Sequence, residues 1–219
     1  METKQPHQAQ NVDWYFDYIS PFAYLQSEQI NELRNVAHVT PKPILFAGLL
    51  NHYGQLGPAE IPGKRVFTYR HTLWLARRQG IPMTYPEGHP FNSLPLLRAT
   101  LAADCSWDFI HAAFRFVWQH GQLPSNTDAF AALLAEHNLD ADALATADVK
   151  NALKDGTGAA TEAGVFGVPT AVVRNELFWG SDAFTMLKEY LDDPQLLESP
   201  EMRRVSALPA AVHRPRSGQ

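Results

Sequence analysis

The sequence predicts an α/β fold in which two distant segments build one small sheet and a block of helices is inserted between them. The first observation is an alternating apolar pattern over residues 12–18, followed at once by a helical pattern. The second is a pair of short segments rich in β-branched and aromatic residues, at 170–173 and 177–179. The third is the stretch from about 64 to 162, which has helical patterns and no strand signal. The predicted order is therefore β-α-β, a helical block, then β-β-α.

The first sheet-forming segment predicts a strand, a helix and a second strand. Pro21 stands in the first turn of the helix, where its missing N–H costs nothing, and the helix should end near residues 34–35. The second strand, at about 39–45, contains Pro41 and Pro43. Because proline donates no hydrogen bond to a neighbouring strand, this strand is expected at an edge or in irregular form.

The segment that follows is rich in glycine and proline. Over residues 48–63 it predicts a long loop, and a long loop in a compact domain is commonly the wall of a site. Further helices are then expected along the inserted block and after the last strand. Their predicted ranges are 64–79, 93–104, 107–118, about 127–137, about 140–155, and a last helix opened by Gly180-Ser181-Asp182 that stops at Asp193-Pro194.

These patterns divide the chain into a discontinuous sheet domain, an inserted all-helical domain and two flexible ends. The sheet domain comprises 11–62 and 163–195, the insertion 63–162, and the flexible termini 1–10 and 199–219.

Composition limits the classes of function. The 219 residues are 45% hydrophobic and 19% charged with a net charge of −5, so nucleic acid and membranes are not expected as partners. The first residues lack the order of a signal peptide, which predicts a cytoplasmic protein. One cysteine, Cys105, permits no internal disulfide. The nine histidines, His89 among them, are irregularly spaced, so structural or surface roles are expected and no metal site.

Ser20 is the first candidate for chemistry because it stands where the first strand meets its helix. A hydroxyl at such a junction can donate a hydrogen bond to a bound thiolate, and a helix N-terminus stabilises negative charge. The alternative is that Ser20 only caps the helix, which is the commonest role of serine at this position.

The step Val168-Pro169-Thr170 is the second candidate, because it leads directly into a strand. If the bond before Pro169 is cis, the backbone groups of Val168 turn outward and can pair with a peptide-like ligand as an added strand. The alternative is an ordinary trans proline at the start of a strand.

Taken together, these segments resemble the 2-hydroxychromene-2-carboxylate isomerase family, from about Val12 to Leu191. That family shares a thioredoxin-like fold with kappa-class glutathione transferases and DsbA-type oxidoreductases. The motifs that carry the resemblance are Asp17-Tyr18-Ile19-Ser20-Pro21-Phe22-Ala23-Tyr24-Leu25, the segments 43–50, 89–94 and 164–170, and Leu177-Phe178-Trp179-Gly180-Ser181-Asp182. The resemblance implies a thioredoxin-like domain with an inserted all-helical domain.

The resemblance also implies glutathione as the cofactor. Ser20 would contact the glutathione sulfur, with Pro21 and Phe22 beside it. Val168, next to Pro169, would pair with the cysteinyl backbone. Ser181 and Asp182 would hold the γ-glutamyl end, since a hydroxyl suits its carboxylate and a carboxylate suits its ammonium. The alternative is that Ser181 and Asp182 merely cap the last helix.

Three further positions match the family pattern less specifically. Lys64 would reach the tripeptide or the substrate, or would be a solvated residue at a helix start. Gln55 stands where many relatives have Asn, so its contact with glutathione is open. Asn92 would lie near the substrate, or would cap the helix predicted at 93–104.

The function implied by the resemblance is a glutathione-dependent isomerisation. A thiolate held by Ser20 adds reversibly to the conjugated bond of 2-hydroxychromene-2-carboxylate in its ring-opening form. Rotation and loss of glutathione then give trans-o-hydroxybenzylidenepyruvate, a step of naphthalene-type aromatic degradation. A homodimer is a further expectation.

Three other functions stay open. A kappa-like glutathione transferase would use the same residues on electrophilic substrates. A disulfide oxidoreductase is disfavoured because Ser20 and Ala23 stand where a dithiol pair would be. A binding module without activity would lack glutathione binding.

Overall fold

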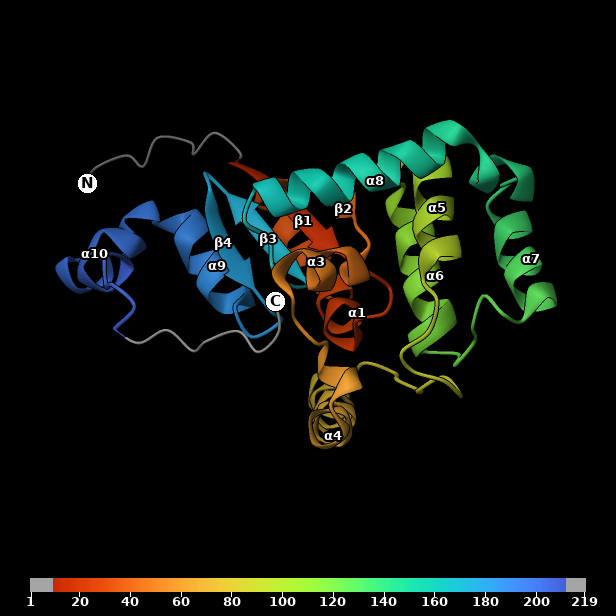
Figure 1. Ribbon diagram of the computed structural model, residues 1–219, viewed down its shortest axis with the longest axis horizontal. Helices are drawn as coiled ribbons and strands as arrows, with labels where there is room; N and C mark the ends of the chain where they lie inside the picture. The colour runs from red at the N-terminus through yellow and green to blue at the C-terminus, as the bar shows by residue number, and fades with distance from the viewer. Residues whose placement is uncertain (1–9, 212–219) are drawn as a thin grey trace.

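The computed structural model describes residues 10–211 and contains one four-stranded sheet of order β2-β1-β3-β4 (Figure 1). The strands are β1 (Gln10–Phe16), β2 (Ala37–Pro43), β3 (Thr170–Val173) and β4 (Glu176–Trp179). β1 pairs in parallel with β2 and antiparallel with β3, and β4 returns antiparallel to β3. The two ends of the chain therefore build one sheet, as the sequence predicts, and β2 lies at its edge.

The central strand β1 explains how helices cover both faces of this sheet. Val12, Trp14 and Phe16 are fully buried on one face, in a core that also contains residues of the inserted helices and of the last sheet-covering helix. Tyr15 points to the opposite face and packs in a smaller cluster with Val168. Alternate side chains of a strand lie on opposite faces, so a strand with both faces covered reads as almost continuously apolar.

The helix expected from Pro21 to residues 34–35 is two short helices, α1 (Pro21–Ser27) and α2 (Ile30–Arg34). The hydroxyl of Ser27 donates a hydrogen bond of 2.7 Å to the carbonyl of Tyr24. A serine bonded to its own preceding turn favours a bend or an end of a helix, which fits the break after Ser27.

The long loop predicted at 48–63 is wrong for its first part, where the structure has helix α3 (Phe46–Tyr53). The N–H of Phe46 donates to Oδ2 of Asp17 at 2.9 Å, and Gly54 ends the helix with φ of 61°. The carboxylate that satisfies this helix start lies 29 residues away, so no local signal marked it. Residues 54–61 remain irregular, apart from the 3₁₀ turn Pro58–Glu60.

The inserted block is helical as predicted. Its helices are α4 (Pro62–Gln79), α5 (Leu94–Ala102), α6 (Trp107–Trp118), α7 (Thr127–Glu136) and α8 (Ala147–Glu162). The stretch predicted as one helix at 140–155 is a 3₁₀ turn followed by α8, which begins where the Thr146 hydroxyl accepts from Val149 N–H. In Figure 1, α5 to α7 stand beside the sheet, α8 crosses one edge of the molecule, and α4 projects from the body.

The C-terminal part has more helix than predicted. After β4 come α9 (Phe184–Asp192), a 3₁₀ turn at Pro194–Glu198 and α10 (Pro200–Ser206). Helix α10 lies in the end expected to be flexible from residue 199; it begins where Ser199 accepts from the Met202 N–H at 3.3 Å and Pro200 supplies a favourable first position. The flexibility of this end remains a prediction. Expectations for residues 1–9 and 212–219 lie outside the described residues.

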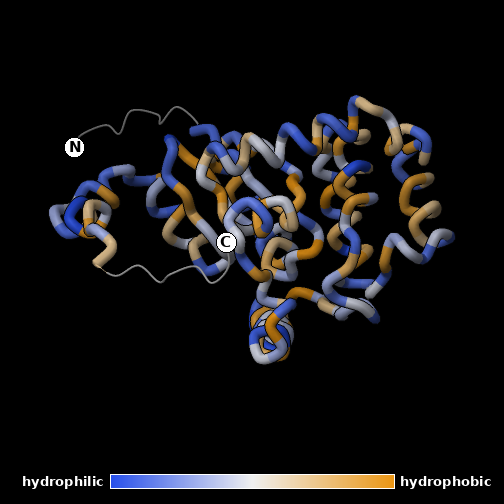
Figure 2. The backbone as a smooth tube through the Cα atoms, viewed as in Figure 1, coloured by the Kyte–Doolittle hydropathy of each residue, from blue (hydrophilic) through white to orange (hydrophobic). Residues whose placement is uncertain are grey.

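The sheet and the insertion share one hydrophobic core. Phe16 of β1 and Phe114 of α6 have ring centroids 5.6 Å apart, and Tyr18 and Phe114 are 4.6 Å apart. Figure 2 shows hydrophobic backbone segments in the strands and along the inserted helices. Within residues 10–211, no helix is both long enough and apolar enough to cross a membrane. The domain boundaries proposed above remain a prediction.

Candidate functional site

The two segments singled out from the sequence meet in the structure. The Ser20 hydroxyl donates to the Val168 carbonyl at 3.2 Å, across a sequence separation of 148 residues. The same oxygen accepts from the Ala23 N–H at 3.2 Å, so Ser20 is also the N-cap of α1. Ser20 is only 6% exposed, and both of its hydrogen bonds are made inside the protein. Ser20 therefore caps α1 and also contacts Val168, and its role toward a thiolate remains a prediction.

The Val168–Pro169 peptide bond is cis. Val168 contacts Ser20, and Pro169 contacts the residue that follows β4. Gly180 donates its N–H to the Pro169 carbonyl at 2.9 Å. Among the described residues, no group accepts a hydrogen bond from the N–H of Val168. This backbone donor thus remains available beside the Ser20 hydroxyl.

The turn Gly180-Ser181-Asp182 is held next to Pro169 by hydrogen bonds of Gly180. The buried Gln26 amide donates to the Gly180 carbonyl at 3.3 Å, and its oxygen accepts from the indole N–H of Trp14 at 2.6 Å. Helix α9 is capped by Ala183 without a side-chain hydrogen bond. Ser181 and Asp182 therefore do not cap it through their side chains, so the alternative assigned to them is wrong.

The three residues before Ser20 are each held by a different part of the protein. Asp17 accepts from the Ile19 N–H at 3.1 Å as well as from α3. The Tyr18 hydroxyl is 2.6 Å from Thr100 Oγ1, and the Tyr18 carbonyl accepts from the Trp118 indole at 2.8 Å. The third residue, Ile19, presents its carbonyl to His89. This turn is therefore fixed by α3, α5, α6 and the segment before α5.

Burial sets the electrostatics of the site. It raises the pKa of the Asp17 carboxyl to about 6, against the opposing effect of hydrogen bonds from Ser93 and from backbone N–H groups. Burial lowers the pKa of His89, opposed by its hydrogen bond to Ile19. From the sequence alone, neither Asp17 nor His89 was assigned a role at the site.

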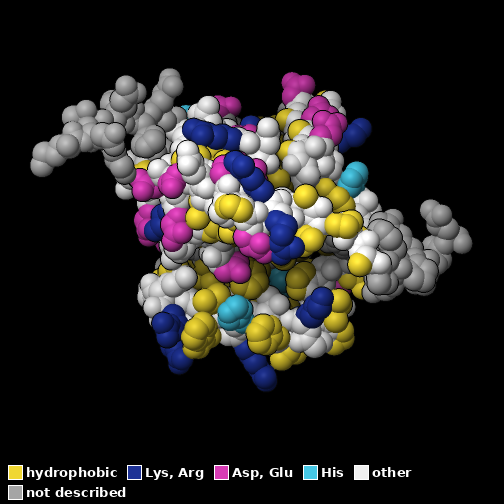
Figure 3. Space-filling model, turned by 90° about the vertical axis from the view of Figure 1, so that its left-hand side faces the viewer, with side chains coloured by type: hydrophobic (Ala, Val, Ile, Leu, Met, Phe, Trp, Pro, Cys, Tyr) yellow, Lys and Arg dark blue, Asp and Glu magenta, His cyan; other side chains and the backbone are white. Residues whose placement is uncertain are grey.

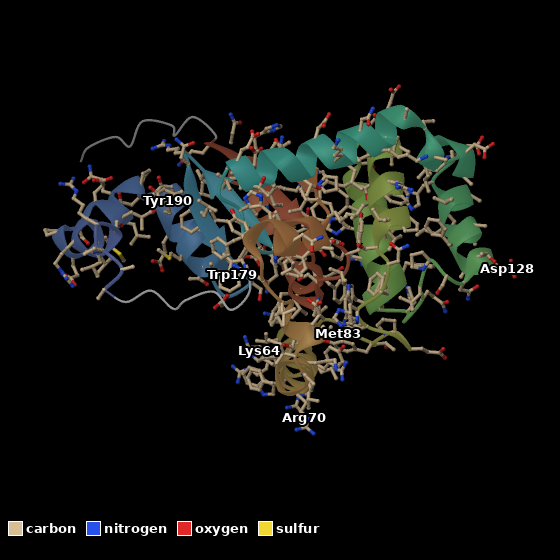
Figure 4. All side chains as sticks on the ribbon, viewed as in Figure 1. Lys64, Arg70, Met83, Asp128, Trp179 and Tyr190 are labelled. Atoms are coloured by element: carbon tan, nitrogen blue, oxygen red, sulfur yellow. The ribbon has the colours of Figure 1, made fainter. Side chains whose placement is uncertain are left out.

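Helix α4 forms another wall of the site. The rings of Phe22 and His71 have centroids 6.0 Å apart, which brings α4 next to the start of α1. Figure 4 shows Lys64 near the beginning of α4, on the same side of the molecule as Trp179 at the end of β4, while Arg70 points away from the body. Figure 3 shows a hollow between α4 and the part of the molecule above it. Lys64 is exposed.

The other two polar candidates are exposed. Gln55 follows α3, and its backbone N–H donates to the Leu50 carbonyl at 2.9 Å. Asn92 accepts from the Leu94 N–H at 3.1 Å through Oδ1, a local bond between residues two apart, made from the position before the N-cap Ser93. Asn92 therefore satisfies an N–H at the start of α5 without being its N-cap, and its contact with a substrate remains a prediction.

An exposed aromatic pair was missed by sequence reasoning. Phe166 and Trp179 are 38% and 55% exposed, and their ring centroids are 5.2 Å apart. A Cβ on Gly167 would lie 2.4 Å from Nε1 of Trp179, so the indole fits only because residue 167 is glycine. The signal available in the sequence was Phe166 directly before the Gly-Val-Pro step, together with Trp179 at the end of the strand that returns beside it.

The one cysteine takes no part in this arrangement. Cys105 follows α5, with φ of 54°, and burial raises the pKa of its thiol. Within residues 10–211, no group of three or more His, Cys, Asp or Glu side chains is arranged to hold a metal ion.

Comparisons with known proteins agree with the fold and with the resemblance. The chain is 28% identical to a 2-hydroxychromene-2-carboxylate isomerase of Sphingobium xenophagum, covering 83% of this chain and 98% of that protein. It is 27% identical to glutathione S-transferase kappa 2 of Caenorhabditis elegans, covering 84% and 92%. A solved structure of a 2-hydroxychromene-2-carboxylate isomerase superposes with a TM-score of 0.75 at 23% identity, covering 88% of this chain and 98% of that one.

The family match extends across the sheet and the insertion alike. Residues 11–192 match the DsbA-like thioredoxin domain, a range that runs from β1 to the end of α9. With the sheet order, the Ser20–Val168 contact and this match in agreement, the chain belongs to the family of DsbA-like thioredoxin domains.

Proposed function

We propose that this protein is a glutathione-dependent isomerase of the 2-hydroxychromene-2-carboxylate type. The observation that carries the proposal is the meeting of the Ser20 hydroxyl with the Val168 backbone at 3.2 Å. A hydroxyl donor and a peptide edge side by side suit a ligand that has both a thiolate and a peptide backbone. The relatives named as isomerases and as kappa glutathione transferases support this ligand class.

Binding exchanges hydrogen bonds rather than only adding them. Without ligand, the Ser20 proton is directed at the Val168 carbonyl. When the cysteinyl unit of glutathione pairs with Val168, its N–H donates to that carbonyl, and the Ser20 proton turns to the sulfur. The N–H of Val168, which has no acceptor among the described residues, donates to the ligand carbonyl. Each polar group keeps a partner, and the thiolate gains a donor.

The remaining contacts are assigned by charge. Ser181 would donate to the γ-glutamyl carboxylate and Asp182 would pair with its ammonium. Lys64, exposed in the first turn of α4, would meet a carboxylate of glutathione or of the substrate. Gln55 lies near the end of α3 and would contact the tripeptide. Asn92 is assigned to the substrate only as a lesser contact, since its side chain already serves the start of α5.

The chemistry needs one thiolate and no redox partner. The sulfur adds to the conjugated double bond, forming a C–S bond and placing the electron pair on the carbonyl oxygen of the substrate. The former double bond then rotates as a single bond. Loss of glutathione reforms the double bond in the trans arrangement and regenerates the thiolate. Since Cys105 is the only cysteine, the chain has no dithiol with which to perform disulfide exchange within itself.

A kappa-like transferase is the second candidate, favoured by the similarity to glutathione S-transferase kappa 2. It would use the same thiolate, but the C–S bond would persist in the product. Mass spectrometry of the products from 2-hydroxychromene-2-carboxylate and from 1-chloro-2,4-dinitrobenzene separates the two functions. Turnover with free glutathione unchanged identifies an isomerase, and accumulation of a conjugate identifies a transferase.

The first experiment is calorimetric titration with glutathione, and the thiolate absorbance is followed at about 240 nm. Wild-type protein should bind and show thiolate at neutral pH, whereas Ser20→Ala should lose the thiolate signal. Ser199→Ala is the matched control, because Ser199 caps α10 in the way that Ser20 caps α1. An equal thiolate signal in Ser20→Ala and wild type contradicts the role of Ser20, and absence of binding contradicts the cofactor.

We also propose a homodimer and a cytoplasmic location. Helix α4 supports the dimer, because Val66, Phe67, Leu73 and Trp74 are between 43% and 68% exposed on it. Light scattering after gel filtration tests the dimer, and replacing Phe67 and Trp74 by Gln should shift the mass to that of the monomer. Fractionation of cells expressing the full chain tests the location.

A further inference from the structure

His89 joins the turn of residues 17–20, called the Ser20 turn below, to α4 through both ring nitrogens. Nε2 lies 2.8 Å from the carbonyl oxygen of Ile19, the residue directly before Ser20. Nδ1 lies 2.8 Å from the hydroxyl of Tyr69 on α4. The same hydroxyl donates to the backbone carbonyl of His89, also at 2.8 Å. One imidazole therefore contacts the Ser20 turn on one side and α4 on the other.

The number of protons available to these contacts decides the state of His89. A carbonyl only accepts, so Nε2 carries a hydrogen for Ile19. The single Tyr69 proton cannot serve both the His89 carbonyl and a lone pair on Nδ1. With a neutral ring, one of these two acceptors lacks its donor. With an imidazolium, Nδ1–H donates to Tyr69, Tyr69 donates to the carbonyl, and Nε2–H donates to Ile19, so all three contacts are satisfied.

Burial opposes that cation in the ligand-free protein. The pKa of His89 is lowered by desolvation, which keeps the ring neutral at pH 7. The ring faces Trp118 and Phe91, which carry no charge, with centroids 5.5 and 6.1 Å away. The hydrogen bonds favour the cation and the desolvation favours the neutral ring, so a nearby negative charge decides between them.

Few ionisable groups surround the ring. Tyr69 faces it from α4, where the charge of Arg65 acts on Tyr69, and Tyr85, with its ring centroid 6.1 Å away, faces it from the segment after α4. Asp17 lies in the Ser20 turn and Glu87 on the segment of His89 itself. Burial raises the pKa of both tyrosines, so they stay neutral at pH 7. A thiolate at Ser20 would add a negative charge about one peptide unit from the Ile19 carbonyl that His89 contacts.

We propose that His89 takes up a proton when the glutathione thiolate binds at Ser20, and that the imidazolium then holds the Ser20 turn and α4 around the ligand. The inference rests on the proposed function. The balance is simple: the thiol of glutathione gives a proton to water, His89 takes one from water at Nδ1, and no electrons are transferred. His89 is thus a positioning residue, since it acts through Ile19 and Tyr69 rather than by touching the sulfur.

The test is calorimetric titration with glutathione at pH 7 in two buffers of different ionisation enthalpy, which counts the protons released. Wild-type protein should release close to none, because His89 takes up what the thiol gives. His89→Gln keeps a donor for Ile19 but does not titrate, so it should release about one proton per site. Tyr69→Phe removes the acceptor for Nδ1–H and should also release more than wild type. S-methylglutathione has no thiol and should give the same proton count in all three proteins.

A second readout needs no variant. The ring ¹⁵N resonances of His89 in the full-length protein should change from neutral to imidazolium on addition of glutathione and stay neutral with S-methylglutathione. Equal proton release in wild type and His89→Gln, or a ring that stays neutral with glutathione bound, overturns the inference alone. If glutathione does not bind, the proposed function and the inference fall together, and the first titration shows this directly.

Discussion

Gly167 lies directly against the indole of Trp179, so closely that a Cβ at position 167 would be 2.4 Å from Nε1. The next peptide unit leads into Val168, whose carbonyl accepts from Ser20. The contact between Gly167 and Trp179 therefore fixes two things: the position of the indole at the end of β4 and the path of the chain into Val168. A side chain at 167 can be accommodated only if one of them moves.

Gly167→Ala should destabilise the protein by about 1–3 kcal/mol, the usual cost of overpacking, and should weaken glutathione binding. Denaturant unfolding and calorimetry measure the two effects. Gly158→Ala is the control, because this helical glycine in α8 has open space around it and should gain about 0.5–1 kcal/mol. A stable Gly167→Ala protein with unchanged glutathione affinity would contradict the prediction.

Gln26 couples the core to the Gly180 turn through two hydrogen bonds. Gln26→Leu leaves the Trp14 indole N–H without its acceptor in a fully buried position. An unsatisfied buried donor costs about 1–3 kcal/mol, so the free energy of unfolding should fall by that amount. Glutathione affinity should fall as well, because the Gly180 carbonyl is released just before Ser181. Calorimetry at a temperature where the variant is folded separates the two effects.

Asp182→Asn should behave differently from Gln26→Leu. Asp182 is exposed, and its side chain makes no capping bond to α9. Its replacement should leave the unfolding free energy within about 0.5 kcal/mol of wild type, as is usual for surface changes. If Asp182 pairs with the ligand ammonium, glutathione affinity should fall roughly 10-fold or more. Unchanged affinity for glutathione would remove Asp182 from the binding site.

Asp17 should give the protein an unusual dependence of stability on pH. Its pKa in the folded state is about 6, above its ordinary value of 3.8, so the folded state binds the proton more tightly than the unfolded state. The stability from this residue is complete below pH 4 and is lost as pH rises through about 6. This is the reverse of a carboxylate in an ion pair.

The comparison of wild type with Asp17→Asn isolates this effect. Between about pH 4 and pH 6.5, the unfolding free energy of wild type should fall relative to the variant by up to roughly 3 kcal/mol. Loss of the bonds to Ile19 and Phe46 lowers the stability of the variant at every pH, so the slopes and not the absolute values are compared. Parallel curves across that range would show that Asp17 titrates as it does in the unfolded chain.

The sequence predicted the parts of this protein that are determined locally. The alternation around Trp14, the proline after Ser20 and the β-branched residues at 170–173 act over a few residues, and their elements lie where they were expected. The family resemblance joined the segments of Ser20 and Val168 in one site, but the direct hydrogen bond between them was not predicted.

What the sequence did not predict depends on partners far along the chain. Helix α3 begins because Asp17 accepts from Phe46, and a composition rich in glycine and proline gave no sign of it. His89 was assigned a structural or surface role because the histidines are irregularly spaced along the sequence. Its partners, Ile19 and Tyr69, are 70 and 20 residues away. Hydrogen bonds of this kind appear only when the chain is folded.

The position of β1 in the sheet has a consequence for synthesis of the protein. Its pairing with β2 can form as soon as about forty residues have left the ribosome, but its other neighbour, β3, begins at Thr170. For most of translation, one edge of β1 is uncovered while the helices between the strands fold. An uncovered strand edge invites pairing with other chains. Nascent chains from which residues up to about 165 have emerged should therefore aggregate or bind chaperones, and those from which Trp179 has also emerged should not.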